Sequence, residues 1–335
     1  MYNNSLFNYV FNGFKFNRSL LIEPIPDLRS PFEGILYISI GVVSIILYIP
    51  FFFAIIDKKN YKFPAYKIMA QMAVFDILNL FILGVLSGIN SIMGLSYWNA
   101  PFLSIFYCES GYFLWCSVNG NLIVLATQRC IQIISPSLAD DLFAGSKTYI
   151  WLIIPLLITA AMITFNPMLI YTPVLNMCFL DPFLGYPNKS TTKYDSIFQF
   201  LENVVNSTFL ISIYIIFFII LLIKKKETEV KVKKNGTTDS QNVILLIQTA
   251  SICSITLASN VLYIVEGYIP LPQFTLTVTQ SITLLVHSFP PVIYMMFNNT
   301  LKNTIRGYFK KNKSVAVSMV GKSISIRSAI PVQVI

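Results

Sequence analysis

Residues 32–59 read FEGILYISIGVVSIILYIPFFFAIIDKK, and this stretch decides the class of fold. Between Phe32 and Ile56 the only charged side chain is Glu33, and the run stops at the charged residues 57–59. A helix needs about 20 mainly apolar residues to cross a hydrocarbon core of roughly 30 Å. The stretch therefore predicts a helix that spans a membrane and ends in charge.

The composition of the whole chain extends this prediction. Of its 335 residues, 55% are hydrophobic and only 12% are charged, and the mean hydropathy is +0.66. An ordinary soluble chain carries about 25% charged residues, and a disordered chain needs low hydrophobicity. The net charge of +9 does not indicate a nucleic-acid partner, because the basic residues lie in short runs between apolar blocks. We expect an integral membrane protein that has the lipid bilayer as its partner.

Seven segments have the length and apolarity of membrane spans. They cover residues 32–56, 66–93, 102–134, 149–170, 197–223, 243–268 and 274–297. Ser, Thr and Gln dilute the last two, so six or eight spans remain as alternatives. The expected fold is an all-α membrane protein, built as a seven-transmembrane helix bundle.

The distribution of Lys and Arg predicts the orientation of this bundle. The segments on one side, which include residues 1–31, hold five of the 24 basic residues, and the opposite side holds nineteen. Cytoplasmic segments of membrane proteins are enriched in Lys and Arg. We therefore expect a multi-pass plasma-membrane protein with an extracellular amino terminus (1–31) and a cytoplasmic carboxyl terminus.

The chain changes character after the last span. Leu301, Ile305 and Tyr308 recur with a helical period within residues 299–311, while the basic side chains point elsewhere. This period predicts a short amphipathic helix on the cytoplasmic membrane surface. Residues 312–335 show no strong pattern and are expected to form a flexible cytoplasmic tail.

Three N-x-S/T sequons lie in the segments assigned to the outer side. They begin at Asn3, Asn17 and Asn188. Such asparagines are glycosylation acceptors in extracellular segments. Chance is the alternative, because a sequence rich in Asn and Ser produces sequons freely.

The sequence contains no constellation typical of an enzyme or a metal site. It has one histidine and no C-x-x-C, H-E-x-x-H or G-x-S-x-G pattern,. We expect no catalytic residue, no metal and no cofactor. A membrane transporter or channel is the alternative to a receptor, but the internal repeats and broken spans typical of transporters are missing.

Ionisable side chains inside membrane spans are expensive and often functional. Glu109, Glu202 and Glu266 lie near the outer ends of the third, fifth and sixth expected spans. In one reading they face a shared outer cavity and contact a cationic or hydrogen-bonding ligand. In the other reading they simply contact water.

Several passages together resemble one known family. They are residues 31–38 and 47–50 around the first span, 66–69 opening the second, 128–130 closing the third, 135–139, 142–145 and 181–182. Their order and spacing, over roughly residues 30–310, resemble class T of the nematode serpentine chemoreceptors, within the G-protein-coupled receptor plan. The resemblance implies a chemosensory receptor that binds an external ligand, a small molecule or a peptide, in the outer bundle cavity. It also implies signalling to a heterotrimeric G protein, with sensory cilia as one candidate location.

The resemblance assigns G-protein coupling to the inner end of the bundle. Arg129 closes the third span, where the receptor's G-protein contact usually lies. Its neighbour Gln128 is not an acid, so the usual local ion-pair lock is missing, and an arginine that reaches lipid headgroups is the alternative. Lys224, Lys225 and Lys226 are read both as a stop signal and as part of the G-protein-facing loop.

The resemblance also assigns a switch to the seventh span. Pro291 and Tyr294 match the Asn-Pro-x-x-Tyr element of such receptors, with Pro290 in place of the Asn. Proline bends a helix, and the alternative to a two-state switch is a static kink. Asp76 resembles the buried acid that binds sodium in many receptors, and a neutral, hydrogen-bonded Asp76 is the alternative.

Cys108 and Cys178 are the two cysteines expected near the outer face. An oxidising exterior favours a disulfide between them. In receptors, such a bond ties the second outer loop to the top of the third helix. Two separate buried thiols are the alternative.

Overall fold

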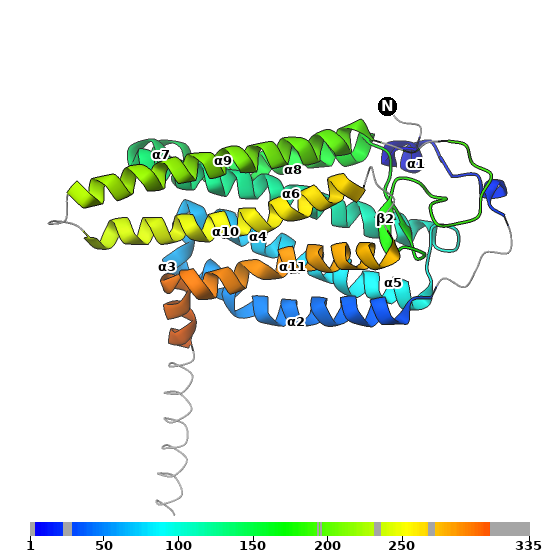
Figure 1. Ribbon diagram of the computed structural model, residues 1–335, viewed down its shortest axis with the longest axis horizontal. Helices are drawn as coiled ribbons and strands as arrows, with labels where there is room; N and C mark the ends of the chain where they lie inside the picture. Colours follow the sequence, from blue (N-terminus) through cyan, green and yellow to red (C-terminus); the bar gives the residue numbers. More distant parts are fainter. Residues whose placement is uncertain are drawn as a thin grey trace, which may run out of the picture.

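The computed structural model describes residues 4–22, 29–192, 194, 196–230, 236–266 and 272–308. Long helices lie side by side along the length of the molecule (Figure 1). The bundle consists of α2 (Pro31–Ile56), α4 (Pro64–Asn79) continued by η2 (Leu80–Leu86) and α5 (Ser87–Met93), α6 (Pro101–Ile134), α8 (Lys147–Phe165), α9 (Ile197–Val230), α10 (Gly236–Glu266) and α11 (Gln273–Phe297).

Five of the described helical segments are long and apolar enough to cross a membrane by length and composition. They are Pro31–Ile56, Pro64–Met93, Lys147–Phe165, Ile247–Val265 and Gln273–Phe297. The helices α6 and α9 have 34 residues each, or about 50 Å at 1.5 Å per residue. They are therefore long enough to accompany the other five across a bilayer.

Several helix boundaries differ from the sequence-based expectation, and two of the differences have a clear physical reason. The fourth expected span ran to residue 170, but α8 ends at Phe165, and Asn166 is extended with ψ 163°. Pro167 follows it, and a residue before proline is pushed out of the helical region. The fifth helix continues to Val230, beyond the expected end at residue 223, because lysine and glutamate continue a helix readily once it leaves the lipid.

The second span packs against α2 through glycines. It contains a π-helical segment, Leu80–Leu86, and π-bulges of this kind often occur at functional sites. A Cβ added to Gly84 would lie 2.9 Å from the Cα of Gly41, and one added to Gly41 would lie 2.9 Å from the carbonyl oxygen of Leu80. The two backbones therefore touch, in the way that small residues permit in membrane bundles.

One end of the bundle, called here the capped end, is covered by the amino-terminal segment and two loops. It carries α1 (Leu6–Phe11), η1 (Arg18–Leu20) and the antiparallel pair β1 (Ile170–Thr172) and β2 (Met177–Phe179), in which Tyr171 is opposite Cys178. An aromatic cluster joins these parts: Phe16, Tyr97, Trp98, Phe183 and Tyr186 are all buried. The described amino-terminal residues 4–22 are thus packed onto the bundle through this cluster.

The opposite end, called here the tail end, carries short helices. These are α3 (Lys58–Tyr61), α7 (Pro136–Phe143) and the helix over residues 299–308, which turns away from α11 (Figure 1). Leu301 is fully buried, and the Tyr308 hydroxyl donates to Asp57 Oδ2 at 2.8 Å. The backbone N–H of Lys59 and this hydroxyl hold the pKa of Asp57 below its ordinary value. The helix is therefore attached to the loop after α2.

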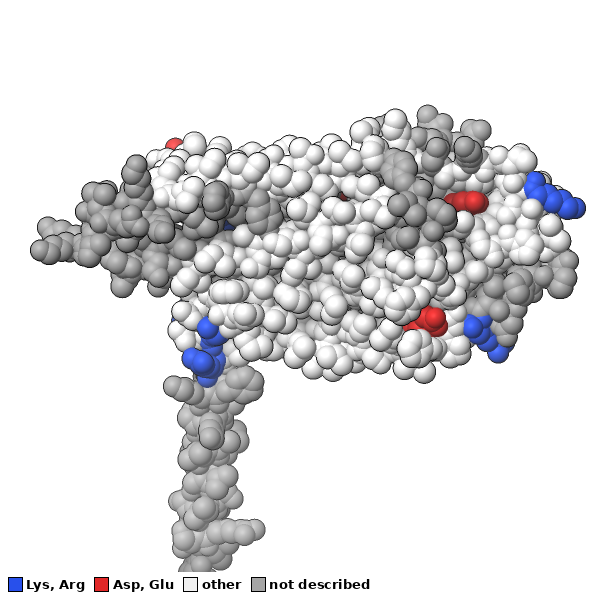
Figure 2. Space-filling view, in the orientation of Figure 1, with Lys and Arg blue, Asp and Glu red and all other residues white. Residues whose placement is uncertain are grey.

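The long sides of the bundle are apolar. In Figure 2, the described Lys and Arg side chains lie at the two ends of the molecule. Large apolar side chains are exposed along the outward face of α8, including Ile150 at 62% and Leu157 at 65%. Exposed apolar area on this scale marks a surface that is covered by another phase, here the lipid. The long helices and their apolar sides make this an all-α membrane bundle.

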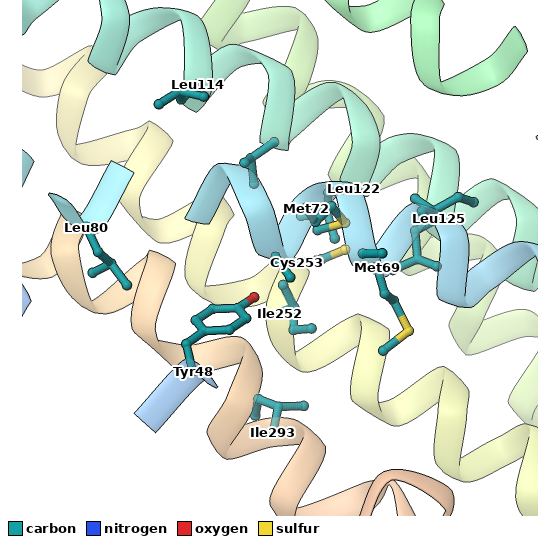
Figure 3. Close-up of a cluster of buried hydrophobic side chains, with 14 of the residues drawn as sticks. Tyr48, Met69, Met72, Leu80, Leu114, Leu122, Leu125, Ile252, Cys253 and Ile293 are labelled. Carbon is teal, nitrogen blue, oxygen red and sulfur yellow. The ribbon is translucent and has the colours of Figure 1, made fainter. Parts of the chain in front are cut away.

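The core lies between α4, α6, α10 and α11. Figure 3 shows Met69 and Met72 of α4 among Leu122 and Leu125 of α6, Ile252 and Cys253 of α10 and Ile293 of α11, all of them buried. Tyr48 of α2 points its hydroxyl toward the middle of this cluster. The polar residues described next lie beside this apolar layer.

Candidate functional site

The centre of the bundle contains a hydrogen-bonded acid and histidine. Asp76 of α4 and His287 of α11 are 1% and 0% exposed. His287 Nδ1 lies 2.8 Å from Asp76 Oδ1, and the Tyr48 hydroxyl donates to Asp76 Oδ2 at 2.7 Å. Buried charged groups are stable only when paired and hydrogen-bonded. The three side chains therefore join α2, α4 and α11 through one network.

Asn79 extends this network to α6. The hydrogen bonds orient its amide so that the oxygen accepts from His287 Nε2 at 2.9 Å and from the backbone N–H of Trp115 at 3.3 Å, while the nitrogen donates to the carbonyl of Gly111 at 3.2 Å,. Gly111 and Trp115 are a helical i, i+4 pair, so Asn79 bridges one turn of α6. With Nε2 donating to Asn79, the second ring nitrogen, Nδ1, makes the hydrogen bond to Asp76.

This arrangement does not fit a sodium ion at Asp76. Hard cations prefer several oxygen ligands, but both carboxylate oxygens of Asp76 already have protein partners, and one of these partners is an imidazole nitrogen. Among the described residues, no group of three or more His, Cys, Asp or Glu side chains is placed to hold a metal ion. The chemistry available here is a hydrogen bond between two buried side chains.

Two aromatic rings pack next to the Asp76–His287 pair, on its side nearer the capped end. The ring of Trp115 is 5.5 Å from that of His287 and 5.7 Å from that of Tyr263, both edge-on. The Tyr263 hydroxyl and Thr283 Oγ1 are 2.8 Å apart. Edge-on aromatic pairs are favourable beyond their burial. The packing connects α6, α10 and α11 at one level of the bundle.

A second acid lies between α6 and α9. Glu202 accepts a short hydrogen bond from the side-chain amide of Asn206 through Oε1, and Oε2 is buried without a partner among the described residues. The Cys116 thiol of α6 is a hydrogen-bond partner of the Glu202 carboxyl, and Tyr112 of α6 interacts with it electrostatically. A buried polar atom without a partner is costly. Glu202 is thus placed to bind a donor that is not part of the described chain.

Further buried polar groups without partners lie about one helical turn closer to the tail end than Trp115 and Tyr263. The amides of Asn119 and Asn260 are both buried with neither polar atom bonded, and Ser207 and Ser259 have buried hydroxyls without partners in the described structure. Asn119 lies four residues beyond Trp115 along α6, and Asn260 lies three residues before Tyr263 along the antiparallel α10. The Trp115–Tyr263 contact therefore places both amides at a similar depth, on the side of the tail end.

Arg129 lies near the tail end of α6. Its Nε and Nη2 atoms are buried and have no hydrogen-bond partner within the described residues. The guanidinium interacts electrostatically with Tyr66 of α4 and Tyr294 of α11. Tyr294 is fully buried, and its hydroxyl also lacks a partner there. The structure brings together two residues that the sequence assigned separately.

The two prolines of α11 lie next to this network. The helix continues from Gln273 to Phe297 through Pro290 and Pro291. Proline lacks an N–H, so the carbonyls of Val286 and His287 lose their usual helical donors. The weakened turn of α11 is therefore the one that carries His287.

Cys108 and Cys178 are joined by a disulfide, with 5.8 Å between their Cα atoms. It attaches β2 to the capped end of α6. The three other cysteines, Cys116, Cys130 and Cys253, are free and buried. The loop that contains β1 and β2 is thereby held against α6.

The three predicted ligand carboxyls do not share one cavity among the described side chains. Glu109 is 7% exposed and accepts the backbone N–H of Leu169 at 2.6 Å, and it lines a pocket on the side of the bundle that Glu202 does not line. The side chains of Glu266 and of Lys224, Lys225 and Lys226 lie outside the described part of the chain.

The sequons differ in accessibility. Asn17 is exposed, whereas the Asn188 amide nitrogen donates to the carbonyls of Phe183 and Tyr186 at 3.3 and 2.9 Å. A glycan on Asn188 would disturb both bonds. Asn3 lies outside the described residues.

Sequence reasoning missed the partners of Asp76. It identified Asp76 and noted His287 as the single histidine, but it did not pair them, and it overlooked Tyr48, Asn79 and Trp115. One signal was present: ionisable residues inside a membrane usually pair with one another, and both residues lie well inside apolar segments.

Comparison with known proteins agrees with this architecture. The model of the family described as serpentine type 7TM GPCR chemoreceptor Srt matches residues 15–317. No curated protein matches the chain. The match covers most of the 335 residues and confirms the resemblance drawn from the sequence passages. The chain therefore belongs to the Srt family of serpentine-type, seven-transmembrane G-protein-coupled chemoreceptors.

Proposed function

We propose that this receptor binds a small external ligand between α6, α9 and α10 and transmits the signal to a heterotrimeric G protein at the tail end. In this proposal the capped end is extracellular, the tail end is cytoplasmic, and the protein acts in the plasma membrane, with sensory cilia as a location. A peptide is the alternative ligand for this region between α6, α9 and α10.

The observation that carries the proposal is a series of buried polar and aromatic side chains, linked by contacts at some steps and by electrostatic interactions at others. It starts at Glu202 with Tyr112 and Cys116 and continues through Trp115 to His287 and Asp76. Tyr294 interacts electrostatically with both Asp76 and Arg129, which brings the series to the tail end.

The same series explains how binding would change the tail end. A ligand shifts a two-state equilibrium only by its differential affinity for the two states. A ligand donor that bonds Glu202 Oε2 would satisfy an unpartnered atom and change the packing around Trp115. Because α11 lacks two hydrogen bonds at His287, this turn offers the least resistance to a rearrangement.

Arg129 is the proposed contact for the G protein. Its unpaired nitrogens lie near the end of α6, and the desolvation of a guanidinium without hydrogen-bond acceptors is costly. A carbonyl or carboxylate of the G protein would satisfy these donors in the active state. The loop after Lys224, Lys225 and Lys226 is proposed to face the same partner.

The proposal is tested by a screen of chemical stimuli in cells that express the receptor, with a G-protein signalling readout. We expect a stimulus that activates the parent and fails to activate Arg129→Ala at equal surface expression. Arg129→Lys keeps the charge and is expected to retain part of the response. Stimulus-evoked ion or solute flux without G-protein signalling would instead favour a transporter or channel, and equal signalling by Arg129→Ala would remove the role given to Arg129.

A further inference from the structure

A pocket opens on the side of the bundle, near the capped end. It has a volume of about 400 Å³ and is lined by Leu6 and Tyr9 of α1, Phe106, Glu109 and Phe113 of α6, and Ile163 of α8, among others. This volume falls within the range of about 300–1,000 Å³ that is typical of small-molecule sites. It shares α6 with the ligand region proposed between α6, α9 and α10, but its other walls come from α1 and α8.

The mouth of this pocket is bordered by exposed apolar side chains. Val10, Phe102 and Phe106 are 60%, 71% and 46% exposed. All three line the pocket, and Phe102 and Phe106 stack with their centroids 6.1 Å apart. An apolar border of this kind, on a bundle with lipid along its sides, favours entry of a molecule that dissolves in the bilayer.

Glu109 is the single charged residue of the lining. Its Oε1 accepts the backbone N–H of Leu169, whereas no donor bonds Oε2 and no basic side chain pairs with the carboxyl among the described residues. Only 7% of the surface of Glu109 is exposed. A carboxylate left buried without a cationic partner is destabilising. The described residues provide no such partner for Glu109.

From these features we infer that the side pocket binds an amphiphilic amine, with its ammonium group at Glu109 Oε2 and its apolar chain along Phe106, Phe113 and α1. The chemistry requires one cationic head and one apolar tail. The site goes beyond the proposed function, because its lining comes from α1, α6 and α8 and does not include Glu202.

The test uses dodecylamine as the probe and the whole receptor in phosphatidylcholine nanodiscs. Binding is measured as the concentration-dependent rise of the unfolding temperature, and 1-dodecanol serves as the uncharged probe of equal chain length. We expect dodecylamine to bind at least about tenfold more tightly than dodecanol, since hydrogen bonds to charged groups contribute about 1.5–3 kcal/mol.

Two variants separate the roles of charge and space. Glu109→Gln keeps an acceptor for Leu169 N–H and removes the charge, so we expect at least about tenfold weaker binding of dodecylamine and unchanged binding of dodecanol. Ser110 also lines the pocket, so Ser110→Leu adds bulk there while Glu109 is retained, and we expect it to weaken the binding of both probes. Glu33→Gln removes an acid at the start of α2 outside the pocket and controls for attraction to surface charge.

The inference is overturned if Glu109→Gln binds dodecylamine as the parent does, if dodecanol binds as tightly as dodecylamine, or if Ser110→Leu has no effect on either. Weaker binding in Glu33→Gln equal to that in Glu109→Gln would overturn it as well. The assay contains no G protein, so its result and the result of the signalling screen are independent of each other.

Discussion

The Asp76–His287 hydrogen bond predicts a strong energetic coupling between the second and seventh spans. The two side chains are 2% and 0% exposed, and their bonded atoms are 2.8 Å apart. Removing one partner of a buried pair costs about 3–5 kcal/mol, because the other is left buried without its counterpart. We expect His287→Leu to lower the free energy of unfolding by about 3 kcal/mol, the lower end of this range, since Tyr48 still donates to Asp76.

The complementary variants turn this expectation into a measurement of coupling. Asp76→Leu removes the acceptor of two hydrogen bonds and is expected to cost about 3–5 kcal/mol. The double variant Asp76→Leu/His287→Leu leaves neither group buried alone. We therefore expect it to cost at least about 2 kcal/mol less than the sum of the two single variants.

The assay is reversible unfolding in mixed SDS micelles, followed by tryptophan fluorescence. A matched control is the neutral pair Ser44 and Ser288, whose hydroxyl oxygens are 2.9 Å apart and which also joins α11 to another helix. Replacing both by Ala is expected to give a coupling of only about 0.5–1 kcal/mol. If the effects of the Asp76 and His287 variants add within about 0.5 kcal/mol, the reasoning about the buried pair is refuted.

Three other variants test the packing, the loop attachment and the unpartnered amides. Gly84→Leu places side-chain atoms against the backbone of Gly41, so we expect loss of folded protein at the cell surface by flow cytometry, whereas Gly307→Ala, with open space around it, should be expressed normally. Cys178→Ser removes the disulfide between positions 70 residues apart and is expected to cost about 2–4 kcal/mol of stability. This loss is measured as a lower unfolding temperature, and an unchanged unfolding temperature would show that the disulfide does not form. Asn119→Leu removes a buried amide without partners, so we expect about 1–3 kcal/mol of added stability together with loss of the response to the stimulus. A loss of stability would contradict the proposal that this amide contacts the ligand between α6, α9 and α10.

The described polar groups fall into two sets that differ in hydrogen bonding and in position within the bundle. Several of the unpartnered groups are on α6, α9 and α10, among them Asn119, Glu202 and Asn260, where we propose that an external molecule satisfies them. Bonded groups gather between α2, α4, α6 and α11, where they hold four helices in one arrangement. Networks of this kind rigidify a core when every member is satisfied, so a change at one member is felt by all four helices.

Much of the fold class was readable from the sequence. Apolar runs such as Phe32–Ile56 need lipid around them, since too little charge is available to cover a soluble surface. The order of the short passages from residue 31 to residue 182 was enough to identify the family, which the family match confirms. These are local properties, because each depends on neighbouring residues along the chain.

The helix ends were less accessible to sequence reasoning. Apolarity marks where lipid begins and ends, but a helix stops where the backbone must change direction. The Asn166–Pro167 step ends α8 although the apolar run continues into β1, and α9 continues as a helix beyond the end of its apolar run.

The composition and order of the residues alone determined that this chain lies in a membrane and which family it belongs to. Only the tertiary structure decided that Asp76 meets His287, 211 residues away, and that Glu109 forms a side pocket with residues of α1. The physical reason is that hydropathy registers how strongly each segment prefers lipid, whereas helix–helix contacts in lipid depend on shape and on hydrogen bonds between side chains. Those matches exist only once the helices have taken their rotations and neighbours.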